Sequence, residues 1–139
     1  MLVESERLGL VEIDPDTIVE LPAGLAGFED ARRFALIPAD EVGAYCWLQS
    51  LDEADLAFLA AVPGFFFPDY EPDLPEEDAD ALGIDRVDQV QLLCLVSIID
   101  DLISANLMGP VVLNVVTRQA RQVVLADQGW STREPLGGA

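Results

Sequence analysis

The chain has 139 residues, of which 51% are hydrophobic, and its 26 acidic residues against seven basic ones give a formal net charge of -19. This length suits one domain with its own core, and the hydrophobic content argues against disorder. Because binding to phosphate needs Lys and Arg, the charge excludes nucleic acid and anionic membranes as direct partners and favours a basic protein.

The charge is concentrated in the first part of the chain. Residues 1–101 hold 24 acidic residues and four arginines, whereas residues 102–139 hold two acidic residues and three arginines. There is no Lys and no His. The alternative to a basic partner is that the acidity serves solubility alone.

The first half of the chain predicts short strands separated by turns. Alternating apolar residues, β-branched runs and turn residues indicate each boundary. The expected strands cover residues 1–4, 8–13, 17–21, 34–38, 45–50 and 56–62, the last two forming a hairpin.

A glycine-punctuated loop follows the third of these strands. Gly24 and Gly27 indicate backbone with positive φ, and a phosphate-binding loop is excluded because no Lys follows. Phe28 at the end of the loop has two interpretations. It either fills the core, which is favoured, or stands at a binding surface.

Four aromatic residues, Phe65, Phe66, Phe67 and Tyr70, lie within six positions and are too many for one strand face. Some must face the core, and others cover an edge or contact a partner. Aromatic side chains rimmed by acidic ones suit a binding hot spot, and core packing is the equal alternative.

Residues 69–88 include nine acidic residues and one arginine. Within them, Pro75, the acidic residues after it and Gly83 mark the start and end of one short helix over residues 75–82. A calcium-binding loop starting at Asp78 is rejected, because Leu82 and Gln89 occupy positions that need oxygen ligands.

The last third predicts three strands of a central sheet. The apolar run 90–99 lies beside two β-branched runs, 111–113 and 123–125, which flank a polar turn. Pro110 belongs at a strand start, edge or bulge, and the amides of Asn106 and Asn114 can satisfy the backbone groups that a bulge leaves open. Residues 131–139 are expected to fray.

These elements predict an all-β fold, a compact antiparallel β-barrel-like single domain with one short helix over residues 1–130. Cys46 and Cys94 lie in apolar surroundings typical of free thiols in a reducing compartment. No secretory signal is visible, and the run 90–99 is far shorter than the roughly 20 residues of a membrane helix. A cytoplasmic protein is expected.

Catalysis is tested by elimination. Without His there is no imidazole base, and without Lys there is neither Schiff-base chemistry nor a phosphate-loop lysine. Two distant cysteines cannot complete a zinc site. Carboxylate pairs could still hydrolyse glycosides, so a carboxylate hydrolase is the remaining enzymatic alternative. The expectation is a protein that is not an enzyme and has no cofactor or metal.

Several short motifs, in order and spacing, resemble the FliW family of bacterial flagellar assembly factors. They are G-L-A-G-F-E at 24–29, L-Q-S at 48–50, L-A-F-L at 56–59, F-P-D-Y at 67–70, S-A-N-L-M-G-P-V-V-L-N at 104–114 and T-R-Q-A-R-Q-V-V-L at 117–125. The chain departs from the family at Gly109, where Ala is frequent, and at Ser104, where Thr is frequent.

The resemblance implies a compact barrel-like all-β fold, no catalysis, and binding to flagellin. It also implies binding to CsrA, a small basic RNA-binding dimer that represses flagellin translation. In that scheme newly made flagellin takes up the protein, and flagellin secretion frees it to bind CsrA and release the flagellin message.

Residues of two segments are the candidates for partner contacts. For CsrA the candidates are Phe67, Asp69, Tyr70, Glu71, Asn106 and Leu107, with aromatic anchors and acids for steering. For flagellin, expected as a helical segment in an apolar groove, they are Phe28 and Phe65. The alternative function is a flagellin export chaperone that does not bind CsrA.

Overall fold

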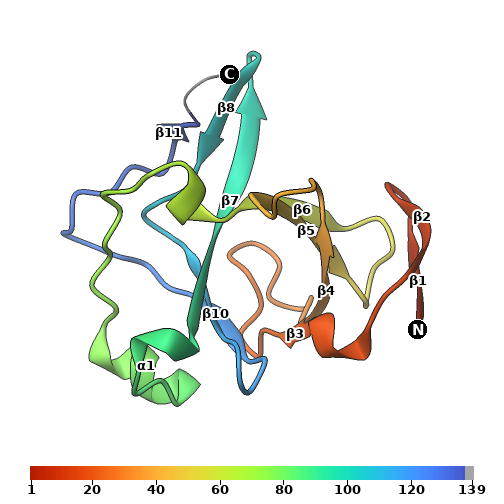
Figure 1. Ribbon diagram of the computed structural model, residues 1–139, viewed down its shortest axis with the longest axis horizontal. Helices are drawn as coiled ribbons and strands as arrows, with labels where there is room; N and C mark the ends of the chain where they lie inside the picture. The colour runs from red at the N-terminus through yellow and green to blue at the C-terminus, as the bar shows by residue number, and fades with distance from the viewer. Residues whose placement is uncertain (137–139) are drawn as a thin grey trace.

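The computed structural model describes residues 1–136 and consists mainly of antiparallel strands (Figure 1). One α-helix, α1 (Glu76–Leu82), lies between the sixth and seventh strands, and the chain has 3-10 turns at η1 (Pro15–Thr17), η2 (Pro63–Phe65) and η3 (Val87–Gln89). The predicted all-β class with one short helix is confirmed. The strands are β1 (Leu2–Ser5), β2 (Gly9–Glu12), β3 (Ile18–Glu20), β4 (Arg33–Pro38), β5 (Tyr45–Ser50), β6 (Ala57–Ala61), β7 (Val90–Ile99), β8 (Leu102–Ala105), β9 (Val111–Asn114), β10 (Ala120–Gln122) and β11 (Glu134–Pro135).

The main sheet curls without closing into a continuous barrel. Its strands follow the order β10-β9-β7-β6-β5-β4-β3, with β8 and β11 branching from β7, while β1 and β2 form a separate hairpin. At the two ends of the path, the Glu20 N–H donates to the Arg118 carbonyl at 2.9 Å, and Glu20 pairs with Gln119 in a single parallel bridge. The fold is therefore barrel-like only in the sense of a curled, open sheet.

Strand β7 is the centre of this sheet. Its first half pairs with β9, through Leu92 and Val112 for example, and its second half pairs with β8, as at Ile98 and Ile103. Both β8 and β9 pair with β7, and residues 106–110 between them lie opposite only Cys94 and Leu95, which makes them an extended bulge with Pro110 directly before β9. A missing N–H costs nothing at that position, which explains why proline is tolerated there.

The predicted hairpin after β9 exists, but its second strand was placed too late. Residues 120–122 form β10, with Arg121 opposite Val112, although these residues are mostly polar. Residues 123–125 instead run alongside the bulge of residues 106–110. The Val123 N–H donates to the Pro110 carbonyl, and the Leu125 N–H donates to the Met108 carbonyl. Val123 and Leu125 are buried by neighbouring segments while Val124 is exposed, an alternation that the sequence alone cannot distinguish from that of a strand in a ladder.

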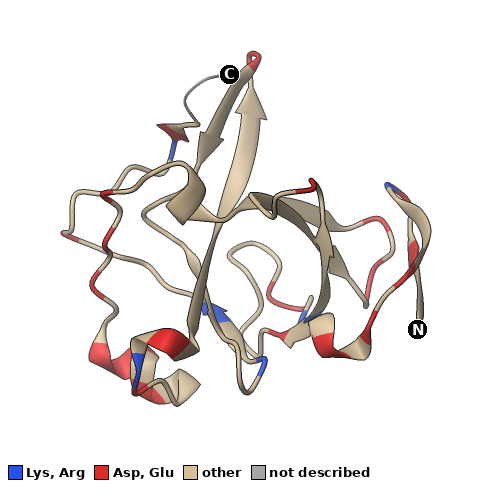
Figure 2. Cartoon of the chain, viewed as in Figure 1, with Lys and Arg blue, Asp and Glu red and all other residues tan. Residues whose placement is uncertain are grey.

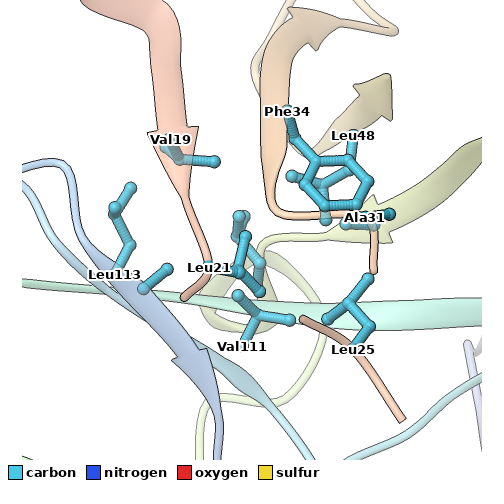
Figure 3. Packing of buried hydrophobic residues seen from close by; sticks show 11 residues of the cluster. Val19, Leu21, Leu25, Ala31, Phe34, Leu48, Val111 and Leu113 are labelled. Atoms are coloured by element: carbon cyan, nitrogen blue, oxygen red, sulfur yellow. The ribbon is translucent and has the colours of Figure 1, made fainter. Parts of the chain in front are cut away.

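The two faces of β7 pack into different hydrophobic clusters. Leu93 and Leu95 point into the curled sheet, where they meet a cluster that includes Leu21, Leu25 and Phe34 (Figure 3). On the opposite face, Cys94 packs under residues 66–70, and Leu92 packs beside α1. Burial on both faces explains the continuous apolar run over residues 92–96, whereas Ile98 and Ile99 at the end of β7 are exposed.

The helix follows its predicted capping signals. Pro75 precedes α1, acidic residues occupy its first turn, and Gly83 ends it with a left-handed φ of 66°. The Asn114 Nδ2 donates to the Leu82 carbonyl at 2.8 Å, and the Arg121 guanidinium lies 3.3 Å from the Asp78 carboxylate. These contacts fix α1 against the β9–β10 hairpin.

The prediction of a frayed tail from residue 131 is wrong for residues 131–136. Strand β11 pairs with β8, the Leu136 N–H donates to the Ile103 carbonyl at 3.0 Å, and the Leu136 side chain is buried. Tertiary pairing with an available strand edge holds a segment whose own sequence has little strand propensity. Residues 137–139 lie outside the described part of the chain.

Candidate functional site

The segment of residues 65–71, here called the acidic aromatic segment, divides its aromatic side chains between core and surface. Phe66, Phe67 and Tyr70 pack against the core cluster around Cys94, whereas Phe65 in η2 is exposed. Asp69 and Glu71 are exposed on either side of Tyr70. The core and surface alternatives therefore both apply, to different residues.

Tyr70 fixes this segment in place. Its hydroxyl donates a 2.7 Å hydrogen bond to the Leu107 carbonyl, and its ring meets Trp130 edge-on with ring centres 4.7 Å apart. Burial, with the neighbouring Cys94 thiol, holds the pKa of the Tyr70 hydroxyl well above its ordinary value. The hydroxyl thus remains a neutral donor, and the segment presents its acids from a fixed backbone.

A hollow of about 380 Å³ lies beside the segment. Phe67, Asp69 and Tyr70 line it from this segment, and Leu107 and Trp130 line it from elsewhere in the chain. Leu107 is only 3% exposed, so its side chain cannot form a large partner contact. Its role in the candidate site is to support Tyr70, through the carbonyl that accepts the Tyr70 hydrogen bond.

Asn106 lies next to Leu107 in the chain but lines a different groove. Its Oδ1 accepts a hydrogen bond from the Gly109 N–H at 2.9 Å, which closes the bulge as predicted. A Cβ at Gly109 would lie 3.1 Å from the Asn106 amide nitrogen, so this bulge leaves little room for a side chain at that position. Asn106 lines a groove of about 470 Å³ to which no residue of the acidic aromatic segment contributes.

Gln122 joins the two sides of that groove. Its Oε1 accepts from the Ala26 N–H at 2.9 Å, and its Nε2 donates to the Gly109 carbonyl at 3.1 Å. The glycine loop, the bulge and β10, three of the motifs quoted above, therefore meet at one side chain. The sequence marks Gln122 only as part of a polar turn, because nothing local indicates which distant backbone groups its amide reaches.

Phe28 and Phe65 lie apart from these hollows. Phe28 is 42% exposed and packs edge-on against Phe58, with ring centres 5.1 Å apart. The favoured interpretation of Phe28 as a core plug is therefore wrong; Leu25, which is 1% exposed, fills the core from the same loop. Gly24 with φ of 69° and Gly27 with φ of 85° turn the loop so that Leu25 points inward.

Trp130 and Gln128 complete the site from the C-terminal side, and sequence reasoning missed both. Gln128 accepts from the Asp73 N–H at 2.9 Å and donates to the Asp73 carbonyl at 2.8 Å, so its amide holds the acidic stretch after Tyr70. A tryptophan close to an expected frayed end was a signal that this part of the chain packs, because large aromatic side chains are mostly buried.

Both cysteines are free thiols, as expected. Burial raises the pKa of Cys94 from 9.0 to about 12, and burial together with Asp40 raises that of Cys46 to about 11. Neither is a thiolate near neutral pH, so neither is a nucleophile of the kind that enzymes use. Within residues 1–136, no three His, Cys, Asp or Glu side chains gather in a metal-binding arrangement.

Charged residues are distributed unevenly along the folded chain (Figure 2). Acidic residues follow α1 and the loops around it, while the central strands carry few charges. Of the nearby arginines, Arg121 contacts Asp78, and Arg86 contacts Asp88 at 3.4 Å. Among the described residues, no helix is both long and apolar enough to span a membrane.

Comparison with known proteins gives one consistent result. The sequence model described as FliW protein matches residues 2–136. The flagellar assembly factor FliW of Bdellovibrio bacteriovorus is 38% identical, with 98% of this chain and 79% of that protein covered, and that of Bacillus subtilis is 31% identical, with 99% and 98% covered. A crystal structure of the flagellar assembly factor FliW superimposes with a TM-score of 0.88 at 29% identity, covering 98% of this chain and 96% of the other. The chain belongs to the FliW family of flagellar assembly factors.

Proposed function

We propose that this chain is a non-enzymatic cytoplasmic regulator that binds flagellin and, when free of flagellin, binds and antagonises CsrA. Antagonism of CsrA relieves repression of flagellin translation. The observation that carries the proposal is the pairing of exposed Asp69 and Glu71 with Tyr70, whose position is fixed by Leu107 and Trp130. A rigid acidic surface with an aromatic centre suits a basic protein partner.

Charge supplies a mechanism for the antagonism. A protein of net charge -19 docked beside an RNA-binding surface repels the phosphates of the message, without occupying the contacts that RNA makes. The same charge speeds association with a basic partner at low salt. Asn106 and Gln122 lie in a separate groove and contribute by holding the bulge that carries Leu107.

Flagellin is assigned to a different surface, with exposed Phe28 and Phe65 as candidate contacts. Single exposed aromatic side chains suit the apolar face of a helical segment. A flagellin export chaperone without CsrA binding is the alternative function, and the same experiment separates the two.

The test is titration of the purified protein into CsrA at low salt and at roughly 0.15 M salt, with flagellin absent and then present. Binding that weakens with salt and is lost with flagellin supports the proposal. Flagellin binding without CsrA binding leaves the chaperone alternative. The variant Asp69→Lys/Glu71→Lys should slow association with CsrA, and Glu4→Lys/Glu6→Lys, with the same charge change on exposed residues of the N-terminal hairpin, serves as the control.

A further inference from the structure

An apolar cavity of about 350 Å³ lies on the other side of Tyr70 from the hollow described above. Its floor is formed by β7 and β9, where Leu92 pairs with Val112, and Pro110 adds its ring at the start of β9. Leu74, Val87, Val90 and Leu125 also line it, so that the lining is mostly apolar. We call it the Val87 cavity.

The roof of the Val87 cavity is held open by tethers at two points. The first is Tyr70, bonded to the Leu107 carbonyl, and the second is Asp73, whose N–H and carbonyl are both bonded by Gln128. Pro72 between them stiffens the backbone. A roof tethered on both sides of a proline keeps the cavity preformed, which lowers the entropic cost of filling it.

The mouth of the cavity is apolar, and its surroundings are acidic. Val87 at the mouth is 90% exposed, an unusual position for a large apolar side chain. Glu71 lines the cavity, Asp73 and Asp88 are exposed directly next to lining residues in the chain, and Asp85 is exposed two residues before Val87. Arg86, the one basic residue of this stretch, is already close to Asp88.

We propose that the Val87 cavity binds a large apolar side chain presented by a basic segment of a partner protein. Apolar lining selects the side chain, and the acidic rim selects cationic residues on either side of it. A second copy of this chain is disfavoured as occupant because both copies would carry a charge of -19. The inference rests on the proposed function only in that the partner is basic.

A substitution that adds negative charge at the cavity mouth separates binding in the cavity from general electrostatic attraction of a cationic partner. Val87→Asp makes the protein more acidic, so attraction alone predicts equal or tighter binding of a cationic peptide. The cavity predicts weaker binding, by about tenfold, because an apolar contact of valine size is lost. The probe is a synthetic amphipathic peptide of leucine and lysine, with a matched peptide in which alanine replaces leucine.

Val42→Asp is the matched control, because Val42 is similarly exposed, at 70%, and lies in the turn between β4 and β5. It should bind the peptide as the parent does or slightly more tightly. Val90→Phe, which fills the cavity from β7, should also weaken binding, with an unchanged thermal midpoint as the check on folding. Methyl NMR shifts at Leu74 and Leu92 should accompany binding of the leucine peptide.

Equal binding by Val87→Asp and Val42→Asp would overturn the cavity proposal, as would equal binding of the alanine peptide. If Asp69→Lys/Glu71→Lys still slowed association with CsrA in that case, the proposed function would stand without the cavity. If neither Val87→Asp nor Asp69→Lys/Glu71→Lys weakened the binding of CsrA, both the cavity proposal and the proposed function would be contradicted.

Discussion

The Tyr70 hydroxyl and the Leu107 carbonyl, 37 residues apart in the chain, are joined by a 2.7 Å hydrogen bond. This bond links the acidic aromatic segment to the bulge between β8 and β9. It also separates the two hollows that border Tyr70, so one side chain shapes both candidate contact surfaces.

Replacing Tyr70 with Phe should therefore destabilise the protein and loosen the segment. The Leu107 carbonyl loses its side-chain donor in a part-buried position, which costs about 1–3 kcal/mol in the free energy of unfolding. Urea unfolding measures this cost. Tyr45→Phe is the control, because the Tyr45 hydroxyl has no hydrogen-bond partner within residues 1–136, and equal costs for both variants would contradict the assigned role.

Replacement of Gly24 by any residue with a Cβ is predicted to destabilise the fold strongly. It has φ of 69°, and a Cβ there would lie 2.5 Å from the Cα of Glu29. Gly24→Ala should cost about 3 kcal/mol or more, since backbone strain and a clash with main chain add together. Gly27→Ala has comparable φ but open space around it, so it should cost about 1 kcal/mol. Thermal unfolding of Gly24→Ala and Gly27→Ala separates the steric clash with the Glu29 main chain from the backbone strain of positive φ. Similar unfolding midpoints for the two variants would show that the loop relaxes and removes the clash.

A negative charge at position 114 should destabilise the protein. Its Nδ2 donates to the Leu82 carbonyl, and its Oδ1 accepts from the Val116 N–H at 2.9 Å, with the side chain buried. Asn114→Asp removes the donor and buries a carboxylate at the negative end of α1, at a cost of about 3 kcal/mol.

Asn106→Asp is the matched comparison for Asn114→Asp. The Asn106 side chain uses its Oδ1 as acceptor from Gly109, a role that aspartate retains. We expect a cost of less than about 1 kcal/mol in denaturant unfolding. A comparable loss in both variants would mean that burial of charge, rather than the bond to Leu82, dominates at Asn114.

Stability should fall as pH rises above about 9. In the unfolded chain the thiols titrate near 9.0, whereas the folded pKa is raised to about 12 for Cys94 and about 11 for Cys46. The folded state thus holds protons that the unfolded state releases, so this stability is complete below pH 9 and is lost through pH 11 and 12. The slope is up to about 1.4 kcal/mol per pH unit for each thiol.

Urea unfolding between about pH 8 and about pH 10.5 measures this slope. Cys94→Ala lowers the stability at every pH but should reduce the slope, because one of the titrating groups is gone. Tyr70, whose pKa is also raised, contributes with the same sign. An unchanged slope in Cys94→Ala would show that other groups control the alkaline transition.

Local patterns in the sequence determined the elements of this protein and its class. Turn residues and β-branched runs placed β4, β5 and β6 to within a residue or two, and Pro75 and Gly83 placed α1. Such signals act over a few residues, since strand alternation, capping and positive φ are local properties of the backbone. The acidic charge, which favours a basic partner, also needs no structure.

The tertiary structure alone decided which distant groups meet. Tyr70 reaches Leu107, Gln122 joins Ala26 to Gly109, and β11 adds to β8 at an end expected to fray. It also moved Phe28 to the surface and Leu107 to the interior. Hydrogen bonds and burial depend on the positions of backbone groups many residues away. Those positions are set only when the sheet curls, so a local pattern in the sequence carries no information about them.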